Sequence, residues 1–473
     1  MLQCHQKREQ ISVTFLTFKS SIDKKIWRGR ELFSLQVEYV IIKQNFMEYK
    51  EILQIIKSQL LQLHIIIQND DIINYNFMFR LNQLAGQFKE VKFLADPLEY
   101  LRLYDMLEKD EKDICFAVRK FAQEKAAPTI NKYVEAAEFP TEIVEALKPL
   151  KLIHKTDTYV KTGLAYLELA KVDAGLSTFY LLISSLVPHS IETFGSEDQK
   201  KKYLTRIKDM DILGGWALTE REYGSDASSL QTSVKKVQGG YLLNGNKRWI
   251  GNGNKDILVV WARNTENNNI EGFIVENKWA GVHAEPIKHK LALRIVQNCQ
   301  ITFKDVFIPD ENRMPKAKDF QNGVTQALQH SRVGVPWIAL GIQAGVYENV
   351  VKFVTRRKQF GKHVAGFQLQ QERLTRILTT FQASFLMVIQ VSRLAQEKKA
   401  TLGQIAAVKA WVTDKTREVA RLGREMMGGD GILVENYCIK ALTDAEVVYT
   451  YEGSYDINSL IAGREITGLA AFK

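Results

Sequence analysis

The spacing of apolar residues changes twice along the chain, and this limits the folds that the sequence can adopt. From Pro97 to about residue 211 apolar residues recur at intervals of three and four, which predicts amphipathic helices. Between residues 212 and 315, short runs such as DILVVWAR and CQITFKDVFIP predict β-strands separated by turns. The helical spacing then returns and continues to the terminus. We therefore expect a mainly α protein with a helical domain (96–211), a middle β domain (212–315) and a C-terminal helical bundle (316–473).

The first 95 residues differ from the rest because they are rich in Ile, Gln, Asn and Lys. They could form a helical extension or a targeting region, or reflect a wrongly assigned gene start. The stretch MFRLNQLAGQFKEVKFL, which begins at Met78, has the basic amphipathic character of a transit peptide, although Glu90 is unusual for one.

Charge and composition exclude several classes of protein. The net charge is +10 over 473 residues, but basic residues are interspersed with acids and no zinc-finger or RNA-binding signature is found, so we expect no nucleic-acid partner. No stretch of about 18 apolar residues is free of charge, so we expect no membrane span. The four cysteines form no CxxC pair, which argues against a disulfide framework and a metal site and favours a reducing compartment.

Five short stretches carry chemical information, whereas the common nucleotide-binding, serine-hydrolase and metalloprotease motifs are absent. They are WALTEREYGSD (216–226), NGNKRWIGNG (244–253), RRKQFG (356–361) with FQ (367–368), REMMGGDG (424–431) and YTYEGSYDIN (449–458). Each also has a structural explanation: Trp249 could pack a hairpin, the glycine pair could stop a helix, and Glu452 could be a solvated turn residue. The Asn244–Gly245 pair predicts a hairpin turn.

In this order, these stretches resemble the acyl-CoA dehydrogenase family over residues 97–473. Within it, the chain is similar to glutaryl-CoA dehydrogenase and, more closely, to plant-type short-chain acyl-CoA oxidases. The segments TYEGSYDIN, GREITGLAAFK, STFYLLISSL and KRWIGN carry this closer match. The resemblance implies a helical N-terminal domain, a β-barrel-like middle domain and a C-terminal four-helix bundle. It also implies bound FAD and a homotetramer built as a dimer of dimers.

The resemblance implies that Glu452 is the catalytic base. It would remove the α-proton of an acyl-CoA while the β-hydrogen leaves as hydride to flavin N5, which gives a trans-2-enoyl-CoA. The backbone N–H of Glu452 and a flavin ribityl hydroxyl would polarise the thioester oxygen, and Gly453 would leave room for the thioester. Burial beside Tyr451 should raise the pKa of the carboxyl group. Some relatives place the base just before the arginine that Arg332 matches, but here that position is Ser331, which cannot serve as a base.

Binding residues are assigned by the same resemblance, position by position, and three of them, Arg357, Phe360 and Gln368, match contacts made from a neighbouring subunit. The expected FAD contacts are Trp216, Ala217, Leu218, Thr219, Ser225, Trp249, Ile250, Gly251, Arg357, Phe360, Gln368, Glu425, Gly428, Gly429, Ser454 and Asp456. The expected substrate contacts are Ser177, Thr178, Ser225, Leu328, Arg332, Gly453 and Phe472.

Several positions depart from the family pattern. Where the glutaryl enzyme has an arginine and a serine for the distal carboxylate, this chain has Ser177 and Leu181, so an uncharged short-chain acyl group is expected. Gly251 stands where many dehydrogenases have Thr or Ser, and Arg221 replaces a usual proline. A glycine-rich loop expected between Leu152 and Val160 is missing.

The electron acceptor remains open between an electron-transfer flavoprotein, as for a dehydrogenase, and O₂, as for an oxidase. The terminal sequence AFK is not a peroxisomal signal, which favours the mitochondrial matrix and a dehydrogenase, whereas the subgroup resemblance favours an oxidase and leaves the peroxisome as the alternative. A second interpretation, motivated by the N-terminal extension and the missing loop, is an inactive family member that serves as an assembly or scaffold subunit. A third, a DNA-associated flavoprotein, is suggested by charge alone.

Overall fold

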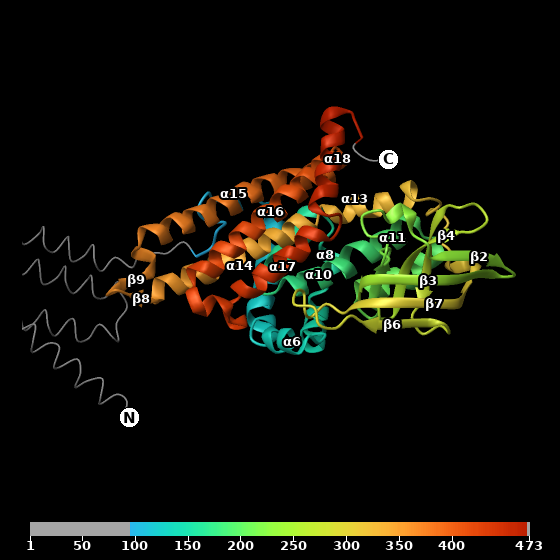
Figure 1. The fold of residues 1–473 in the computed structure, drawn as a ribbon, viewed down its shortest axis with the longest axis horizontal. Helices are drawn as coiled ribbons and strands as arrows, with labels where there is room; N and C mark the ends of the chain where they lie inside the picture. The colour runs from blue at the N-terminus through green and yellow to red at the C-terminus, as the bar shows by residue number, and fades with distance from the viewer. Residues whose placement is uncertain (1–94, 471–473) are drawn as a thin grey trace, which may run out of the picture. The chain divides into compact units, whose positions relative to one another are not determined.

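The computed structural model describes residues 95–470 of the chain. The predictions made for residues 1–94 and for Phe472 lie outside the described residues. The described residues belong to one compact unit, which is the part considered below. Its element order is helices, a β block and helices again, as Figure 1 shows, so the expected fold class is confirmed.

The first helical region precedes the sheet. Its α-helices are α5 (Lys109–Phe121), α6 (Ile130–Ala136), α7 (Thr141–Leu147), α8 (Leu152–Lys155), α9 (Tyr159–Ala170), α10 (Ala174–Leu181), α11 (Val187–Phe194) and α12 (Glu197–Lys208). Polar residues before several helices set their starts. Ser196, for example, accepts a hydrogen bond from the backbone N–H of Gln199, whose side chain accepts one from the N–H of Ser196.

The middle region is a seven-stranded, mixed sheet. Six strands lie in the order β1-β4-β2-β3-β7-β6, and β5 pairs with β4. Strand β4 runs parallel to β1 and β2, and the other pairs are antiparallel. The strands are β1 (Gly214–Ala217), β2 (Ser233–Val237), β3 (Gly240–Gly251), β4 (Ile257–Asn264), β5 (Ile270–Glu276), β6 (Val282–Pro286) and β7 (Asn298–Pro309).

The alternation of side chains along β4 explains why both faces of the sheet are covered. Ile257, Val259 and Trp261 pack in one hydrophobic cluster, which includes side chains of α11 and α12. Leu258, Val260 and Ala262 pack in a second cluster, formed by the strands. Because successive side chains of a strand point to opposite faces, a strand buried on both sides is apolar throughout.

The prediction of a hairpin turn at Asn244–Gly245 is wrong. Both residues lie inside β3, and the turn between β2 and β3 is at Gln238–Gly239. Gly245 instead marks an irregularity in the pairing of β3 with β7. Its φ is +140°, and a Cβ there would lie 2.6 Å from the Cα of Thr232, so this position needs glycine for close packing.

The C-terminal region is a bundle of long helices. It contains α13 (Gln326–Arg332), α14 (Val335–Arg356), α15 (Gln368–Gln396), α16 (Leu402–Met426), α17 (Cys438–Thr450) and α18 (Tyr455–Thr467), with a small hairpin of β8 (Lys358–Gln359) and β9 (Lys362–His363) between α14 and α15. Helix α14 packs against α15, α16, α17 and also α9, so one hydrophobic core joins the two helical regions.

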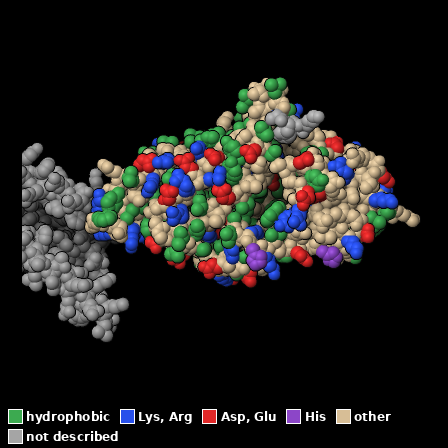
Figure 2. All heavy atoms as spheres, viewed as in Figure 1, with side chains coloured by type: hydrophobic (Ala, Val, Ile, Leu, Met, Phe, Trp, Pro, Cys, Tyr) green, Lys and Arg blue, Asp and Glu red, His purple; other side chains and the backbone are tan. Residues whose placement is uncertain are grey.

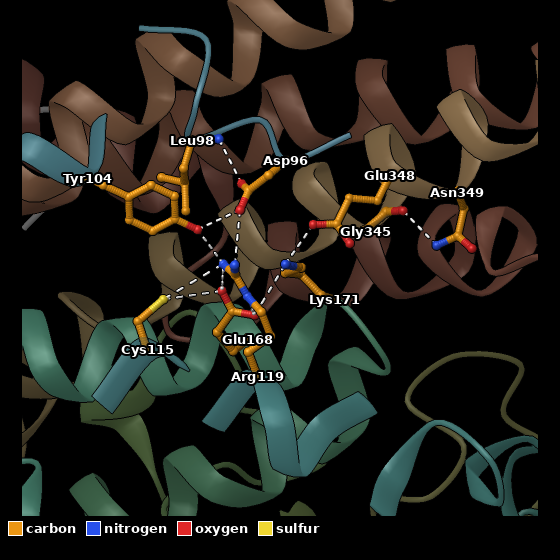
Figure 3. A network of polar contacts seen from close by, with 10 residues as sticks. All are labelled: Asp96, Leu98, Tyr104, Cys115, Arg119, Glu168, Lys171, Gly345, Glu348 and Asn349. Carbon is orange, nitrogen blue, oxygen red and sulfur yellow. Dashed lines mark hydrogen bonds and ion pairs between the residues drawn. The ribbon is translucent and has the colours of Figure 1, made fainter. Parts of the chain in front are cut away.

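A buried network of charges also links these regions (Figure 3). Glu168 of α9, whose side chain is 1% exposed, accepts hydrogen bonds from Nε and Nη2 of Arg119 of α5 at 3.1 and 2.6 Å. Arg119 also contacts Asp96, with 3.0 Å between Nη1 and Oδ2. Lys171 connects Glu168 to Glu348 of α14, with N···O distances of 3.2 and 2.6 Å. Buried charges are tolerated because each has partners of opposite sign.

Two helical stretches are long and apolar enough to cross a membrane by composition, Ala174–Phe194 and Gln368–Gln396. The first is a core segment of this fold, since 89% of its apolar window is buried, and the second belongs to the bundle. On the face shown in Figure 2, Lys and Arg side chains are interspersed with Asp and Glu and form no continuous basic stripe.

Candidate active site

Four residues, 451–454, connect α17 to α18 and form a strained turn around Glu452. Glu452 and Gly453 both have positive φ, +56° and +90°. Only glycine adopts such values freely, and a non-glycine residue there costs on the order of 1–3 kcal/mol. Ser454 ends the turn because its hydroxyl accepts a hydrogen bond from the N–H of Ile457 and so caps α18. This strain persists because neighbouring side chains hold the turn.

Gly453→Ala is expected to disturb this turn. A Cβ at Gly453 would lie 2.8 Å from Nδ2 of Asn458, and the backbone φ of +90° disfavours any L side chain. We expect about 1–3 kcal/mol of lost stability, measured by urea denaturation. Gly463→Ala in the middle of α18, where a Cβ meets no neighbour, is the matched control and should not destabilise the protein. Equal stability of the two variants would show that the turn is not strained.

Side chains of α13 hold Glu452 in place. The hydroxyl of Ser331 donates to Oε2 of Glu452 at 2.5 Å, and Nε of Arg332 donates to the backbone carbonyl of Glu452 at 3.1 Å. Both side chains come from the end of α13, about 120 residues earlier in the chain. Oε1 of Glu452 has no hydrogen-bond partner among residues 95–470. Ser331 therefore holds one oxygen of the carboxyl group, and the other oxygen is free to accept a proton.

The pKa of Glu452 is raised above its usual value, and burial is the main cause. The hydrogen bond from Ser331 and the charges of Arg332 and Lys409 oppose this rise. The expected direction of the shift is confirmed. A carboxylate with a raised pKa is a stronger base, and it is still ionised at a pH above that pKa.

Ser331→Ala should raise the pKa of Glu452 further. The serine hydroxyl stabilises the ionised carboxylate, so its removal favours the protonated form. The pH at which Glu452 becomes ionised should move up by roughly half a unit to one unit. Infrared titration of the carboxyl band checks this shift, with Ser190→Ala, a buried serine bonded to a helix carbonyl, as the control. A titration midpoint that does not move would show that Ser331 makes no bond to Glu452 in solution.

The predicted substrate residues of α10 are not equivalent. The hydroxyl of Ser177 is fully buried and donates to the carbonyl of Tyr166 at 2.8 Å, so it is engaged within the helical core. Thr178 instead lies 3.3 Å from the hydroxyl of Tyr451, beside the turn. Leu328 lies one turn before Ser331 on α13, and its carbonyl oxygen is 3.2 Å from the Ser331 hydroxyl. Of the two α10 residues, the structure therefore brings Thr178 to the turn.

The segment that lacks the expected glycine-rich loop is filled by helix α8 and packs onto α13. The hydroxyl of Tyr159 lies 2.8 Å from Nδ1 of His330, and the His330 ring stacks on His189 with 3.7 Å between centroids. Burial lowers the pKa of His189 to about 4 and that of His330 to about 3, so both rings are neutral near pH 7. The short connection thus forms a packed aromatic group beside Ser331.

Two predicted cofactor segments meet at the edge of the sheet. The N–H of Arg248 donates to the carbonyl of Thr219 at 2.8 Å, and this places Trp249 next to the stretch that follows β1. Trp249 has a φ of +64°, and 52% of its surface is exposed. Gly251 is buried, and a Cβ there would lie 2.6 Å from Cδ1 of Leu182. Ala217, Leu218 and Ile250 are buried beside them, while Ser225 is exposed.

The side chain of Trp216 points away from this edge. Its Nε1 donates to the hydroxyl of Ser190 on α11 at 3.1 Å, and its ring packs against Trp261 in the core. Because the ring of Trp216 lies in the core, only its backbone could contact a ligand. The stretch after it is held by Glu220, which accepts from the backbone N–H groups of Gln231 and Thr232 and pairs with the buried Lys247 at 3.0 Å.

The remaining predicted cofactor residues lie elsewhere. Arg357 and Phe360 lie at the β8–β9 hairpin and Gln368 begins α15, at the end of the bundle opposite the sheet (Figure 1). Helix α14 alone, with 22 residues, separates the two ends by about 33 Å. Phe360 is 93% exposed. Glu425 lies in the last turn of α16, Gly428 and Gly429 follow the end of that helix, and Asp456 is exposed on α18. Within one chain, the predicted cofactor residues of the sheet and those of the β8–β9 hairpin are therefore far apart.

Two residues of the site were not found by sequence reasoning. The sequence excludes Ser331 as a base but does not indicate that its hydroxyl is the hydrogen-bond partner of Glu452. Lys409 of α16 lies fully buried behind the turn. A signal for Lys409 exists in the sequence, because it is the one charged residue within the apolar stretch IAAVKAWV.

The described residues fit a bound FAD in several respects. Trp249 presents an exposed ring, and Arg357, Phe360 and Gln368 are exposed side chains that a ligand can reach. A Cβ at Gly428 or Gly429 would meet nothing, so backbone there can approach a ligand. Within residues 95–470, no cluster of His, Cys, Asp or Glu is arranged to hold a metal ion.

Family models of acyl-CoA dehydrogenases match the chain in three consecutive parts. The N-terminal domain model covers residues 108–211, the middle domain model 215–306 and the C-terminal domain model 322–467. Similar proteins include mitochondrial isovaleryl-CoA dehydrogenase of Arabidopsis thaliana, 28% identical over 74% of this chain and 89% of the relative. Mitochondrial 2-methylacyl-CoA dehydrogenase of Solanum tuberosum is 28% identical over 76% of this chain and 91% of the relative.

Solved structures of acyl-CoA dehydrogenases are also similar to the chain over most of its length. A glutaryl-CoA dehydrogenase from Mycobacterium smegmatis in complex with FADH₂ is 30% identical, with a TM-score of 0.77, and covers 80% of this chain and 100% of its own. Butyryl-CoA dehydrogenase from Megasphaera elsdenii is 28% identical, with a TM-score of 0.72 over 76% of this chain and 98% of its own.

Proposed function

Because the chain belongs to the acyl-CoA dehydrogenase family, whose members are FAD-dependent oxidoreductases, we propose that it oxidises a short-chain, uncharged acyl-CoA to the trans-2-enoyl-CoA with Glu452 as the base. The observation that carries this proposal is the carboxyl group of Glu452, held through one oxygen by Ser331 on a strained turn, with its pKa raised by burial. Such an arrangement suits proton abstraction from carbon.

The backbone of the same turn supports the assignment. Among residues 95–470, no hydrogen-bond partner is found for the backbone N–H of Glu452. An N–H group fixed by the turn can donate to the thioester oxygen, where negative charge develops as the α-proton leaves. Arg332 holds the carbonyl of Glu452, and Lys409 holds those of Tyr449 and Gly453, so the turn that carries this N–H group is fixed. Proton removal and charge stabilisation would then come from one residue.

FAD, when bound, supplies the hydride acceptor. The residues assigned to hold it are the exposed Trp249 with Thr219 and Gly251 from one subunit, and Arg357, Phe360 and Gln368 from a neighbour. The separation of these two groups along α14 and the exposed apolar side chains of Phe360, Leu369 and Ile432 support a homotetramer. The task of the protein is to orient the acyl chain between Glu452 and the ring.

The uncharged substrate is supported by the surroundings of α10. Ser177 and Leu181 are buried, and neither provides a cation for a second carboxylate. The similar proteins named above act on isovaleryl-, 2-methylacyl- and butyryl-CoA according to their names, in keeping with a short acyl group. The glutaryl enzyme is also similar in fold, so glutaryl-CoA is the informative negative control.

Electron-transfer flavoprotein is the acceptor that we propose, and the mitochondrion is the compartment. Both are supported by the names of the two similar plant proteins, which are mitochondrial dehydrogenases. The oxidase alternative makes a different prediction, because an oxidase reacts directly with O₂. The subgroup resemblance and Gly251 are the features that favour it.

A stopped-flow comparison tests the substrate and the acceptor together. Purified protein is mixed without oxygen with butyryl-CoA, isovaleryl-CoA or glutaryl-CoA, and air is then admitted. We expect fast flavin bleaching with one of the uncharged substrates, slow or no bleaching with glutaryl-CoA, and slow re-oxidation in air. Rapid re-oxidation with release of peroxide would identify an oxidase, and faster bleaching by glutaryl-CoA would contradict the proposed acyl pocket.

A further inference from the structure

Lys409 is a fully buried lysine directly behind the catalytic turn. Its Nζ donates to two backbone carbonyls, that of Tyr449 at 2.9 Å and that of Gly453 at 2.7 Å. One carbonyl belongs to the last turn of α17 and the other follows Glu452 immediately. The side chain thus connects α16 to both ends of the segment that carries the base.

Burying Lys409 to make these bonds costs free energy, because a buried ammonium group loses its hydration. No carboxylate lies within ion-pair distance of Lys409 in the described part of the chain. Other buried lysines do have such a partner: Lys247 pairs with Glu220, and Lys440 with Asp173. A lysine kept in the core without a carboxylate in contact indicates a role in the turn rather than in general stability.

We propose that Lys409 is a positioning residue for Glu452, which holds the turn in its strained conformation and favours the ionised carboxylate by its positive charge. This role rests on the proposed function of Glu452 as base. Lys409 touches no reacting atom and acts through the two carbonyls and through space.

The hydrogen-bond pattern supports the positioning part. The Gly453 carbonyl accepts from Lys409 and also from Nδ2 of Asn458, at 2.7 Å in each case. The Tyr449 carbonyl is near the C-terminus of α17, where helix carbonyls lack partners within the helix. Without Lys409 this carbonyl would be unsatisfied, and Glu452 would be freer to leave its positive φ.

The titratable groups that face Glu452 support the electrostatic part. They are Arg332 of α13, Lys409 of α16, Tyr166 of α9 and Tyr451 of the turn itself. Burial raises the pKa of both tyrosines, so they are neutral at pH 7, and Arg332 stays protonated. Burial lowers the pKa of Lys409 to about 7. Of these neighbours, Lys409 is therefore the one whose charge changes near neutral pH.

Lys409→Met tests the role, with Lys440→Met as the matched control. Lys440 is also buried and donates to a backbone carbonyl, that of Val172 at 3.2 Å, but it lies among Asn131 and Asp173. The readout is the protonation of Glu452 in FAD-loaded protein without substrate. The infrared band of its carboxyl group is identified by its loss in Glu452→Gln and is followed from pH 5 to 9.

In Lys409→Met the titration midpoint of Glu452 should rise by about one pH unit, since a positive charge that favours the carboxylate is gone. Flavin reduction by acyl-CoA should slow by about tenfold at a pH below both midpoints, where the ionised fraction of Glu452 falls by that factor. Lys440→Met should change neither. If Lys409→Met does not fold, Lys409→Gln decides by the same readout, because it keeps a donor and removes the charge. An unchanged midpoint in the folded variant would overturn the role.

The two proposals fail in different ways. If Glu452 is not a base for acyl-CoA, wild-type protein will not be bleached, yet the midpoint of Glu452 will still move in Lys409→Met. If Lys409 does not position Glu452, wild-type protein will be bleached and the midpoint will stay in place.

Discussion

Glu452→Gln is expected to bind FAD as the wild type does and to reduce it by acyl-CoA at least about 10³-fold more slowly. The amide has the size of the carboxyl group and can still accept the hydrogen bond from Ser331, so the turn should keep its geometry. What is lost is the ability to take a proton from carbon. Single-turnover stopped-flow measurements of flavin absorbance, made without oxygen, give the rate constant directly.

The matched control for this variant is Glu446→Gln. Glu446 lies on α17, six residues before Glu452, but its side chain is exposed and pairs with Arg417 at 2.8 Å. The control should reduce flavin at the wild-type rate. Reduction by Glu452→Gln at a rate near that of the wild type would mean that another group removes the α-proton.

Glu168→Gln is expected to cause the largest loss of stability, about 3–5 kcal/mol in the free energy of unfolding. Glu168 is the centre of the network in Figure 3. Replacing its negative charge by a neutral amide leaves the positive charges of Arg119 and Lys171 buried without this partner. Because the network joins α5, α9 and α14, the loss should affect both helical regions. The shift of the urea midpoint measures the effect.

A surface pair provides the comparison for Glu168. Glu197 and Lys200 form an ion pair at 2.8 Å, but 76% of the Glu197 side chain is exposed, so Glu197→Gln should change the unfolding free energy by less than about 0.5 kcal/mol. Equal urea midpoints for the two variants would show that the buried network contributes little.

The fold was largely predictable because its signals are local. The apolar run of β4 and the helical spacing on either side of the sheet depend on neighbouring residues, and both appear in the structure. The turn at Asn244–Gly245 was misplaced since the local pattern is that of a hairpin, whereas pairing with β7 keeps both residues inside β3. Tertiary pairing outweighed turn preference there.

The site was less predictable because its contacts are distant in sequence. The position of Glu452 was inferred from family resemblance, and its raised pKa from the aromatic residues beside it. The bond from Ser331 spans 121 residues and that from Lys409 to Gly453 spans 44, so no local pattern indicates either. The interior position of Lys409 follows from the packing of α16 on its neighbours.

The most direct test of the central claim is an anaerobic titration of the FAD-loaded protein with butyryl-CoA, followed by mass spectrometry of the acyl-CoA. We expect the flavin band to bleach in proportion to added substrate, and the recovered acyl-CoA to be two hydrogen atoms lighter. No bleaching and an unchanged acyl-CoA, with butyryl-CoA and with other acyl groups, would contradict the proposed activity and favour a scaffold role for this family member.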